Sequence, residues 1–349
     1  MKIERFEQNP IITPKDVPPS RNDFEVVGTF NAGVTRFNGK IMLLMRVAER
    51  PIEKKQDEEL APILNHQTGQ IEYFKVPHNH PDLEIPDSRV FFYKKNTYLT
   101  SISHLRIATS SDGINFNVEP VPAVFPQTRY ETFGLEDPRI TLIENTYYIT
   151  CKVVSDLGIA TSLITTSDFK NFKRHGIIFC PENIDVVIFP EKINGLFYAL
   201  TRPVPRSLGS LGIWIASSPD MINWGRHKCL MSPRAGMYDS ARLGASCVPI
   251  KTARGWLEIY HAADENNRYC LAACLLDIED PSKVIAYSNE PLMQPQADYE
   301  INGFFGNVIF SCGATVDDEI ITIYYGAADC VIAGAKVKIT DILNHLEKV

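Results

Sequence analysis

The sequence contains no long hydrophobic run. Nowhere do the roughly 18 consecutive apolar residues of a transmembrane helix occur. The N-terminus, Met1-Lys2-Ile3-Glu4-Arg5, also lacks the apolar segment of a signal peptide. These absences predict a cytoplasmic protein with no membrane partner.

Several motifs of common enzyme classes are also missing. There is no Cys-x-x-Cys pair and no His-Glu-x-x-His, so the eight cysteines predict buried, reduced thiols rather than a metal site. There is no Gly-x-Ser-x-Gly, no Walker A motif and no Gly-x-Gly-x-x-Gly, which leaves a serine nucleophile and nucleotide chemistry without support. A net charge of −7 argues against a nucleic-acid partner. We expect no metal and no cofactor.

A short phrase recurs along the chain. An Asp is followed three residues later by Asn and then by an aromatic residue at Asp112, Asp168 and Asp220, each time after an alternating strand-like run. Looser copies surround Asp280 and Asp341. The five markers lie about 52 to 61 residues apart, which is enough for four strands and their loops. Asp and Asn favour turns, so each copy indicates a strand that leads into a turn.

A second phrase, a turn followed by a hydrophobic strand, precedes the markers at Asn38, Asn96, Asn145, Asn194, Arg254 and Asp318. Only residues 340–348 have the period of an amphipathic helix, with Asp341 as a candidate cap. The sequence therefore predicts an all-β fold, a five-bladed β-propeller with a short C-terminal helix. We expect residues 1–349 to form a single catalytic domain, with residues 49–86 as a long loop and short hairpin on one rim.

Polar residues that recur at one place in each blade converge on the axis of a propeller. The densest group is Gly134-Leu135-Glu136-Asp137-Pro138-Arg139, which combines two carboxylates with a guanidinium. Acid catalysis at a glycosidic oxygen requires such a carboxyl in a partly dry site. The alternative is an Asp-Pro turn at a blade edge with a surface ion pair. Tyr260, Tyr324 and Tyr325 are the candidates for stacking against a sugar.

At these residues the sequence resembles glycoside hydrolase family 130, whose members are mannoside phosphorylases and β-mannosidases built on a five-bladed propeller. The resemblance runs nearly end to end, through residues 9–14, 30–33, 134–139, 189–193, 255–261 and 324–329. It is greatest for the branch that acts on β-1,2-linked mannose, judged by residues 30–33, by Tyr238-Asp239-Ser240 and by the insertion after Arg50.

The resemblance implies a mechanism. Asp137 would protonate the leaving oxygen through a sugar hydroxyl, and inorganic phosphate, the co-substrate, would attack the opposite face to give α-mannose 1-phosphate. The implied phosphate-binding residues are Arg46, Arg139, Lys192, Arg202, His261 and Tyr325. The implied sugar-binding residues are Asn31, Glu136, Glu191, Asp239, Asp264, Arg268 and Asp329. A phosphorylase needs such cations because its nucleophile is already an anion that has only to be positioned.

Two positions depart from the pattern of many phosphorylases in this family. Thr201 stands where a His is expected, and Ala262 follows His261 where Gly is common. The alternatives are an inverting β-1,2-mannosidase, a phosphorylase of β-1,4-mannosides and a sugar-binding propeller without activity. The sequence leaves open whether the chain forms a homo-oligomer.

Overall fold

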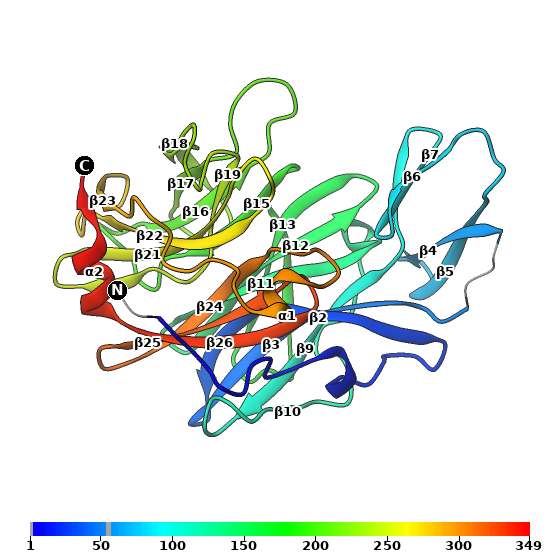
Figure 1. The fold of residues 1–349 in the computed structure, drawn as a ribbon, viewed down its shortest axis with the longest axis horizontal. Helices are drawn as coiled ribbons and strands as arrows, with labels where there is room; N and C mark the ends of the chain where they lie inside the picture. The colour runs from blue at the N-terminus through cyan, green and yellow to red at the C-terminus, as the bar shows by residue number, and fades with distance from the viewer. Residues whose placement is uncertain (1–2, 54–56) are drawn as a thin grey trace.

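Five antiparallel blades, each a meander in chain order, make up most of the molecule. The computed structural model describes residues 3–53 and 57–349 (Figure 1). The first two blades contain β2 (Phe24–Phe37), β3 (Lys40–Pro51), β9 (Ile102–Ser110) and β10 (Asn117–Val118), then β11 (Gly134–Ile143), β12 (Thr146–Ser155), β13 (Gly158–Thr166) and β14 (Lys173–Phe179). They join into one sheet through a single parallel pair between β9 and β11.

The other three blades follow the same plan. The third contains β15 (Asn183–Ile188), β16 (Phe197–Pro203), β17 (Ile213–Ser218) and β18 (Gly225–Met231). The fourth contains β19 (Arg242–Ala245), β20 (Ile250–Thr252), β21 (Gly255–Ala263), β22 (Tyr269–Leu276) and β23 (Val284–Tyr287). The fifth contains β24 (Ile309–Asp317), β25 (Ile320–Ala327) and β26 (Val331–Lys338), with β1 (Glu4–Arg5) added at its outer edge. This is the predicted five-bladed propeller.

The recurring Asp forms the same turn in three blades. In the turns of Asp112, Asp168 and Asp220, one carboxylate oxygen accepts the backbone N–H groups two and three residues on. The other oxygen accepts the side-chain amide of the Asn three residues on, at 2.7–2.8 Å. The repeated phrase therefore corresponds to a repeated Asx turn at the end of a blade strand. Asp341, by contrast, lies inside a helix.

The helices are short. Besides two 3₁₀ turns, η1 (Pro14–Asp16) and η2 (Arg129–Glu131), the described residues contain α1 (Asp298–Ile301) and α2 (Ile339–His345). The predicted C-terminal helix covered residues 340–348, whereas α2 begins one residue earlier, at Ile339, and ends three residues earlier, at His345. Lys338, not Asp341, is its N-cap, and Ile342, Leu343 and Leu346 are buried, as an amphipathic segment requires. No helix of the described chain has the length and apolar content to cross a membrane.

The rim insertion is larger than the predicted loop and hairpin. It forms a two-stranded sheet, β4 (Glu58–Asn65) and β5 (Gln70–Pro77), and a three-stranded sheet, β6 (Leu83–Asp87), β7 (Val90–Tyr93) and β8 (Asn96–Leu99). The two sheets project from one side of the propeller (Figure 1), and stacked Phe74, Phe91 and Tyr98 rings pack between them. The strand at Asn96, which we assigned to a blade, therefore belongs to the insertion.

The cysteines of the structure are free thiols, as the sequence predicts, but not all are buried. Cys180 and Cys229 are exposed and Cys330 is partly buried, whereas the buried ones are Cys151, Cys247, Cys270, Cys274 and Cys312. Burial raises the pKa of Cys151 and Cys247 to about 12, so these thiols stay protonated at neutral pH.

The N-terminal segment closes the last blade. β1 pairs antiparallel with β26, with Glu4 opposite Lys336 and Arg5 opposite Ala335. The anchor is Glu300, which is fully buried. Its carboxylate accepts hydrogen bonds from Arg5 Nε at 2.7 Å, Tyr325 Oη at 2.8 Å and the backbone N–H groups of Gln296 and Ala297 at 2.7 and 3.0 Å. Burial acts to raise the pKa of Glu300, but these donors lower it overall.

We predict that Glu300→Ala lowers the free energy of unfolding by about 2–4 kcal/mol, because it leaves the buried Tyr325 hydroxyl and the partly buried Arg5 without their acceptor. Urea unfolding at pH 7 measures this effect. Glu265→Ala, which removes an exposed carboxylate, is the control and should stay within about 0.5 kcal/mol of the original protein. A loss below about 1 kcal/mol for Glu300→Ala would show that the closure does not depend on this carboxylate.

Candidate functional site

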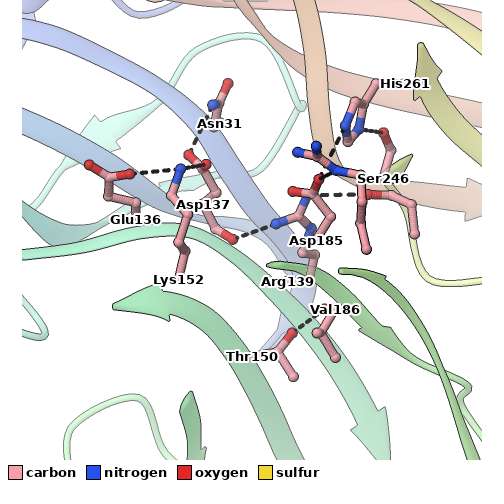
Figure 2. A network of polar contacts seen from close by, with 12 residues as sticks. Asn31, Glu136, Asp137, Arg139, Thr150, Lys152, Asp185, Val186, Ser246 and His261 are labelled. Atoms are coloured by element: carbon pink, nitrogen blue, oxygen red, sulfur yellow. Dashed lines mark hydrogen bonds and ion pairs between the residues drawn. The ribbon is translucent and has the colours of Figure 1, made fainter. Parts of the chain in front are cut away.

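The first strands of three blades carry a β-bulge at the same place. The bulges contain Asn31 in β2, Asp137 in β11 and Asp185 in β15, with φ of 48°, 48° and 54°. A bulge inserts one residue and redirects its side chain, and Asn and Asp tolerate positive φ better than most residues. Because these first strands pack against one another, the three side chains converge (Figure 2).

Asp137 lies in a cluster of alternating charges, the Asp137 cluster, formed by Asn31, Arg46, Glu136, Asp137 and Lys152. Lys152 Nζ lies 2.9 Å from Asp137 Oδ2 and 2.7 Å from Glu136 Oε2. Arg46 bridges the same two carboxylates, at 3.2 Å to Asp137 and 2.6 Å to Glu136. The amide of Asn31 donates to Asp137 Oδ1 at 2.9 Å. Two cations thus balance two carboxylates.

The charges in this cluster set the ionisation of its carboxyl groups. Burial acts to raise the pKa of Asp137, but Lys152, Arg46 and Arg139 together hold it well below the usual range of Asp. Asp329 behaves in the opposite way, since burial raises its pKa to about 6 and Arg46 only partly offsets this effect. Asp137 is therefore ionised in the ligand-free protein, whereas the pKa of Asp329 is about 6.

A second group, the Asp185 cluster, contains Arg139, Asp185, Arg202 and His261. Asp185 accepts from Arg202 Nε at 2.6 Å and from Arg139 Nη2 at 3.0 Å, and His261 Nε2 lies 3.3 Å away. Burial lowers the pKa of His261 to about 4 despite the neighbouring Asp185, so its imidazole is neutral at pH 7. Two guanidinium groups against one carboxylate leave this cluster with a charge of about +1.

Close packing holds His261 against Asp185. A Cβ at Gly244 would lie 2.4 Å from the His261 ring and 2.6 Å from Asp185 Oδ2, so only glycine fits between them. On its other side the ring approaches Ser246 Oγ, 3.2 Å from Nδ1. The imidazole is therefore fixed in one orientation (Figure 2).

Arg139 joins the two clusters. Its Nη1 donates to the Asp137 carbonyl oxygen at 3.0 Å, while Nη2 donates to Asp185 and to the carbonyl oxygen of Ala245 at 3.2 Å. Within the described chain, Arg139 Nε and Thr201 Oγ1 are buried without a hydrogen-bond partner, and the nearest acceptor to His261 Nε2 is Asp185 Oδ2, 3.3 Å away and not aligned for a hydrogen bond. Buried donors of this kind usually have a partner, so they indicate a place where a ligand is bound.

Several residues predicted for the site lie outside both clusters. Glu191 and Lys192 are exposed on the surface. Glu191 pairs there with Lys251 at 2.5 Å, and the Lys192 ammonium lies over the Phe197 ring. Tyr325 is buried in the closure of the last blade, where it donates to Glu300. These contacts offer no support for a phosphate-binding role of Lys192 or Tyr325.

Three further candidates are engaged elsewhere. Asp239 is buried beside Arg234, at 2.8 Å, and burial raises its pKa. Asp264 accepts the backbone N–H groups of Asn266 and Arg268 and so stabilises its own turn. Arg268 is exposed and donates to the Pro295 carbonyl oxygen. Sugar-binding roles for Asp239, Asp264 and Arg268 stay predictions.

The tyrosines proposed for stacking are not available for it. Tyr260 and Tyr324 are buried in the core, as Tyr325 is. The Tyr324 hydroxyl donates to the Gly113 carbonyl oxygen, and Tyr260 Oη lies 3.0 Å from Tyr238 Oη. These tyrosines pack the interior instead of facing a cleft.

The sequence reasoning missed Lys152 and Asp185. Lys152 lies in a largely apolar strand, between Cys151 and Val153. A charged residue between two apolar neighbours was the only sequence feature that could have indicated its role. Asp185 stands at the same bulge position in β15 that Asp137 occupies in β11, so an alignment of the first strands of the blades could have found it.

The comparisons with known proteins agree with this fold. A profile described as β-1,4-mannooligosaccharide phosphorylase, of glycoside hydrolase family 130, matches residues 76–348. The chain belongs to glycoside hydrolase family 130. A β-1,2-mannobiose phosphorylase of Listeria innocua is 47% identical over 99% of both chains, and a 1,2-β-oligomannan phosphorylase of Thermoanaerobacter is 36% identical over 98% of this chain and 99% of its own. The solved complex of the Listeria phosphorylase with β-1,2-mannobiose superposes with a TM-score of 0.96 over 99% of each chain.

We predict that Asp137→Asn lowers kcat/KM at least about 100-fold, because the amide cannot donate the proton that a leaving oxygen needs. Steady-state kinetics with a β-mannoside measures this loss, and the melting temperature reports on folding. Asp112→Asn makes the same change in an exposed Asx turn, so it should retain activity within about twofold. Unchanged turnover of Asp137→Asn would exclude Asp137 as the acid.

Glu258 is a buried carboxyl beside the Asp185 cluster. Its Oε1 accepts the Ser246 N–H at 3.2 Å, and Oε2 has no hydrogen-bond partner in the described part of the chain. Burial raises the pKa of Glu258 well above the usual range, so the folded protein holds it protonated. The unfolded chain releases this proton at a lower pH, and the folded state therefore loses stability as the pH rises above about 4.5.

We predict that Glu258→Gln removes this pH-dependent loss, because a neutral amide has no proton to release. Between pH 5 and pH 8 the free energy of unfolding should fall less in the variant than in the original protein, by up to about 1.4 kcal/mol per pH unit. Urea unfolding at several pH values measures it, with Glu265→Gln as the exposed control. If the free energy of unfolding depends on pH in the same way for the original protein and Glu258→Gln, Glu258 is ionised in the folded protein.

Proposed function

We propose that the protein catalyses the inverting phosphorolysis of β-1,2-linked mannosides, such as β-1,2-mannobiose or short oligosaccharides, and releases α-mannose 1-phosphate. Inorganic phosphate is the co-substrate, and no other cofactor takes part. The observation that carries this proposal is the unequal charge of the two joined clusters. The Asp137 cluster is balanced, whereas the adjacent Asp185 cluster has an excess positive charge and buried donors without partners.

Each cluster has a different role in the reaction: the Asp185 cluster binds phosphate, and the Asp137 cluster acts on the leaving oxygen. Phosphate binds beside Arg139, Arg202 and the neutral His261, where the excess positive charge of the Asp185 cluster attracts it. Asp137 acts on the leaving oxygen on the other side of the mannose ring and needs a proton from solvent or substrate to do so. Because attack and departure occur on opposite faces of the anomeric carbon, the configuration inverts.

A hydrolase would need a general base near the anomeric carbon to activate water. Of the carboxylates outside the two clusters that the sequence suggested for the site, Glu191, Asp239 and Asp264 are each held by other contacts. The clusters themselves supply cations for an anionic nucleophile. This arrangement favours phosphorolysis over hydrolysis.

The linkage rests on the relatives. Both full-length relatives described above are named for β-1,2-linked mannosides, and the family profile is named for the β-1,4 linkage. Because the 47% identity extends over 99% of the chain and the superposition is close, we take the β-1,2 linkage as the substrate class. The cytoplasm is the location we propose, since the phosphate ester would be retained there.

Product analysis tests the proposal. With β-1,2-mannobiose, we expect mannose and α-mannose 1-phosphate to appear only when inorganic phosphate is present, and the anomer to be assigned by NMR spectroscopy. β-1,4-mannobiose is the control for linkage and should react at least about 10-fold more slowly, a difference of about 1.4 kcal/mol in transition-state binding. Free mannose released at equal rates with and without phosphate would show a hydrolase instead.

A further inference from the structure

The rim insertion carries an arginine to the edge of the site. Arg89 lies in the turn between β6 and β7, where its Nε and Nη2 donate to the two oxygens of Asp87 at 3.1 and 2.9 Å. Its guanidinium group lies over the Phe305 ring, 4.5 Å from the centroid. The arginine is thus held by a bidentate ion pair on one side and by an aromatic face on the other.

Phe305 is fixed next to the Asp137 cluster. It lies in the loop between α1 and β24, and its N–H donates to the Ala328 carbonyl oxygen at 3.0 Å. The N–H of Ala328 in turn donates to the Val308 carbonyl oxygen at 3.0 Å. Asp329 is the next residue, so this loop brings Phe305 to the carboxyl group whose pKa is near 6.

Arg89 and Arg46 act on the same carboxyl group. The charges of both arginines lower the pKa of Asp329, against the stronger effect of burial. Geometry gives the same link, because the N–H of Phe305 is hydrogen-bonded to Ala328, the residue before Asp329, and the Phe305 ring lies against the Arg89 guanidinium. Arg89 retains free donor capacity, because its Nη1 makes no hydrogen bond within the described residues and its side chain is 36% exposed.

We propose that Arg89 and Phe305 bind the leaving mannosyl unit of the substrate, the same unit that is the acceptor in the reverse reaction. This inference rests on the proposed function. Phosphate at the Asp185 cluster attacks from one face, so the leaving unit departs on the side of Asp137 and Asp329, toward Arg89. Guanidinium N–H groups donate to sugar hydroxyls, and the part of the Phe305 ring that Arg89 leaves uncovered can pack against sugar C–H groups, since Phe305 is only partly buried.

The reverse reaction separates this site from the phosphate site. For Arg89→Gln we expect the KM for mannose as acceptor to rise about 10-fold, the loss expected for a hydrogen bond to a charged group, with the KM for α-mannose 1-phosphate within twofold. Arg89→Lys should recover part of the acceptor affinity. Arg36→Gln removes an arginine that pairs with Asp317 on the exposed surface, so it should change neither constant. Equal KM values for Arg89→Gln and the original protein, or an equal rise in both constants, would overturn the inference.

A binding experiment tests the inference without turnover. In the inactive Asp137→Asn protein, calorimetry should show β-1,2-mannobiose bound about 10-fold more weakly after a second change, Arg89→Gln or Phe305→Leu. Unchanged binding in both double variants would overturn the inference. If Arg89→Gln does not fold, Phe305→Leu and Arg89→Lys test the same contacts. A protein that binds mannobiose through Arg89 yet forms no mannose 1-phosphate would contradict the proposed function alone.

Discussion

The buried guanidinium of Arg139 is the interaction on which the site depends. It lies in β11 and is almost completely buried, so its charge and its donors have to be satisfied within the protein. Its partners come from three blades: the Asp137 carbonyl oxygen in β11, the Asp185 carboxylate in β15 and the Ala245 carbonyl oxygen in β19. One side chain therefore fixes the spacing of three first strands, and breaking any contact leaves a buried charge poorly compensated.

The Asx turns and the β-bulges, each found in three blades, have separate functions. The Asx turns use Asp and Asn side chains to satisfy their own backbone, so they end strands at the periphery without taking part in the site. The bulges do the reverse, since they interrupt the ladder and turn Asn31, Asp137 and Asp185 toward one another. The repeated turns thus define the strands of the blades, and the bulges within these strands place the polar side chains of the site.

This division explains how much could be predicted from the sequence. The Asx turns are local and leave the same short phrase in three blades, with looser copies in the last two, so the fold follows from repetition. Asp137 was found because Asp-Pro-Arg is dense in functional groups. Asp185 was missed because the residues compared in this blade begin at Phe189, four residues after Asp185, so that Glu191 and Lys192 on the exposed surface were selected instead.

Other features depend on contacts that no local pattern reveals. Lys152 is recognised only when β12 pairs with β11 and places it opposite Glu136. Tyr324 and Tyr325 look like sugar platforms in sequence, but packing of the last blade buries them. The rim insertion likewise needs tertiary context, because its aromatic residues stabilise small sheets of its own rather than a blade.

The ionisation of Asp137 links the two clusters to one another. With Lys152, Arg46 and Arg139 around it, Asp137 is ionised in the ligand-free protein, whereas the proposed mechanism requires it to deliver a proton. A phosphate anion beside Arg139 would offset part of the positive charge that holds the pKa of Asp137 down. The arginine that joins the clusters would then couple phosphate binding to protonation of the acid. On this reasoning the acid becomes competent only when the nucleophile is in place, and this order disfavours cleavage of the mannoside by water.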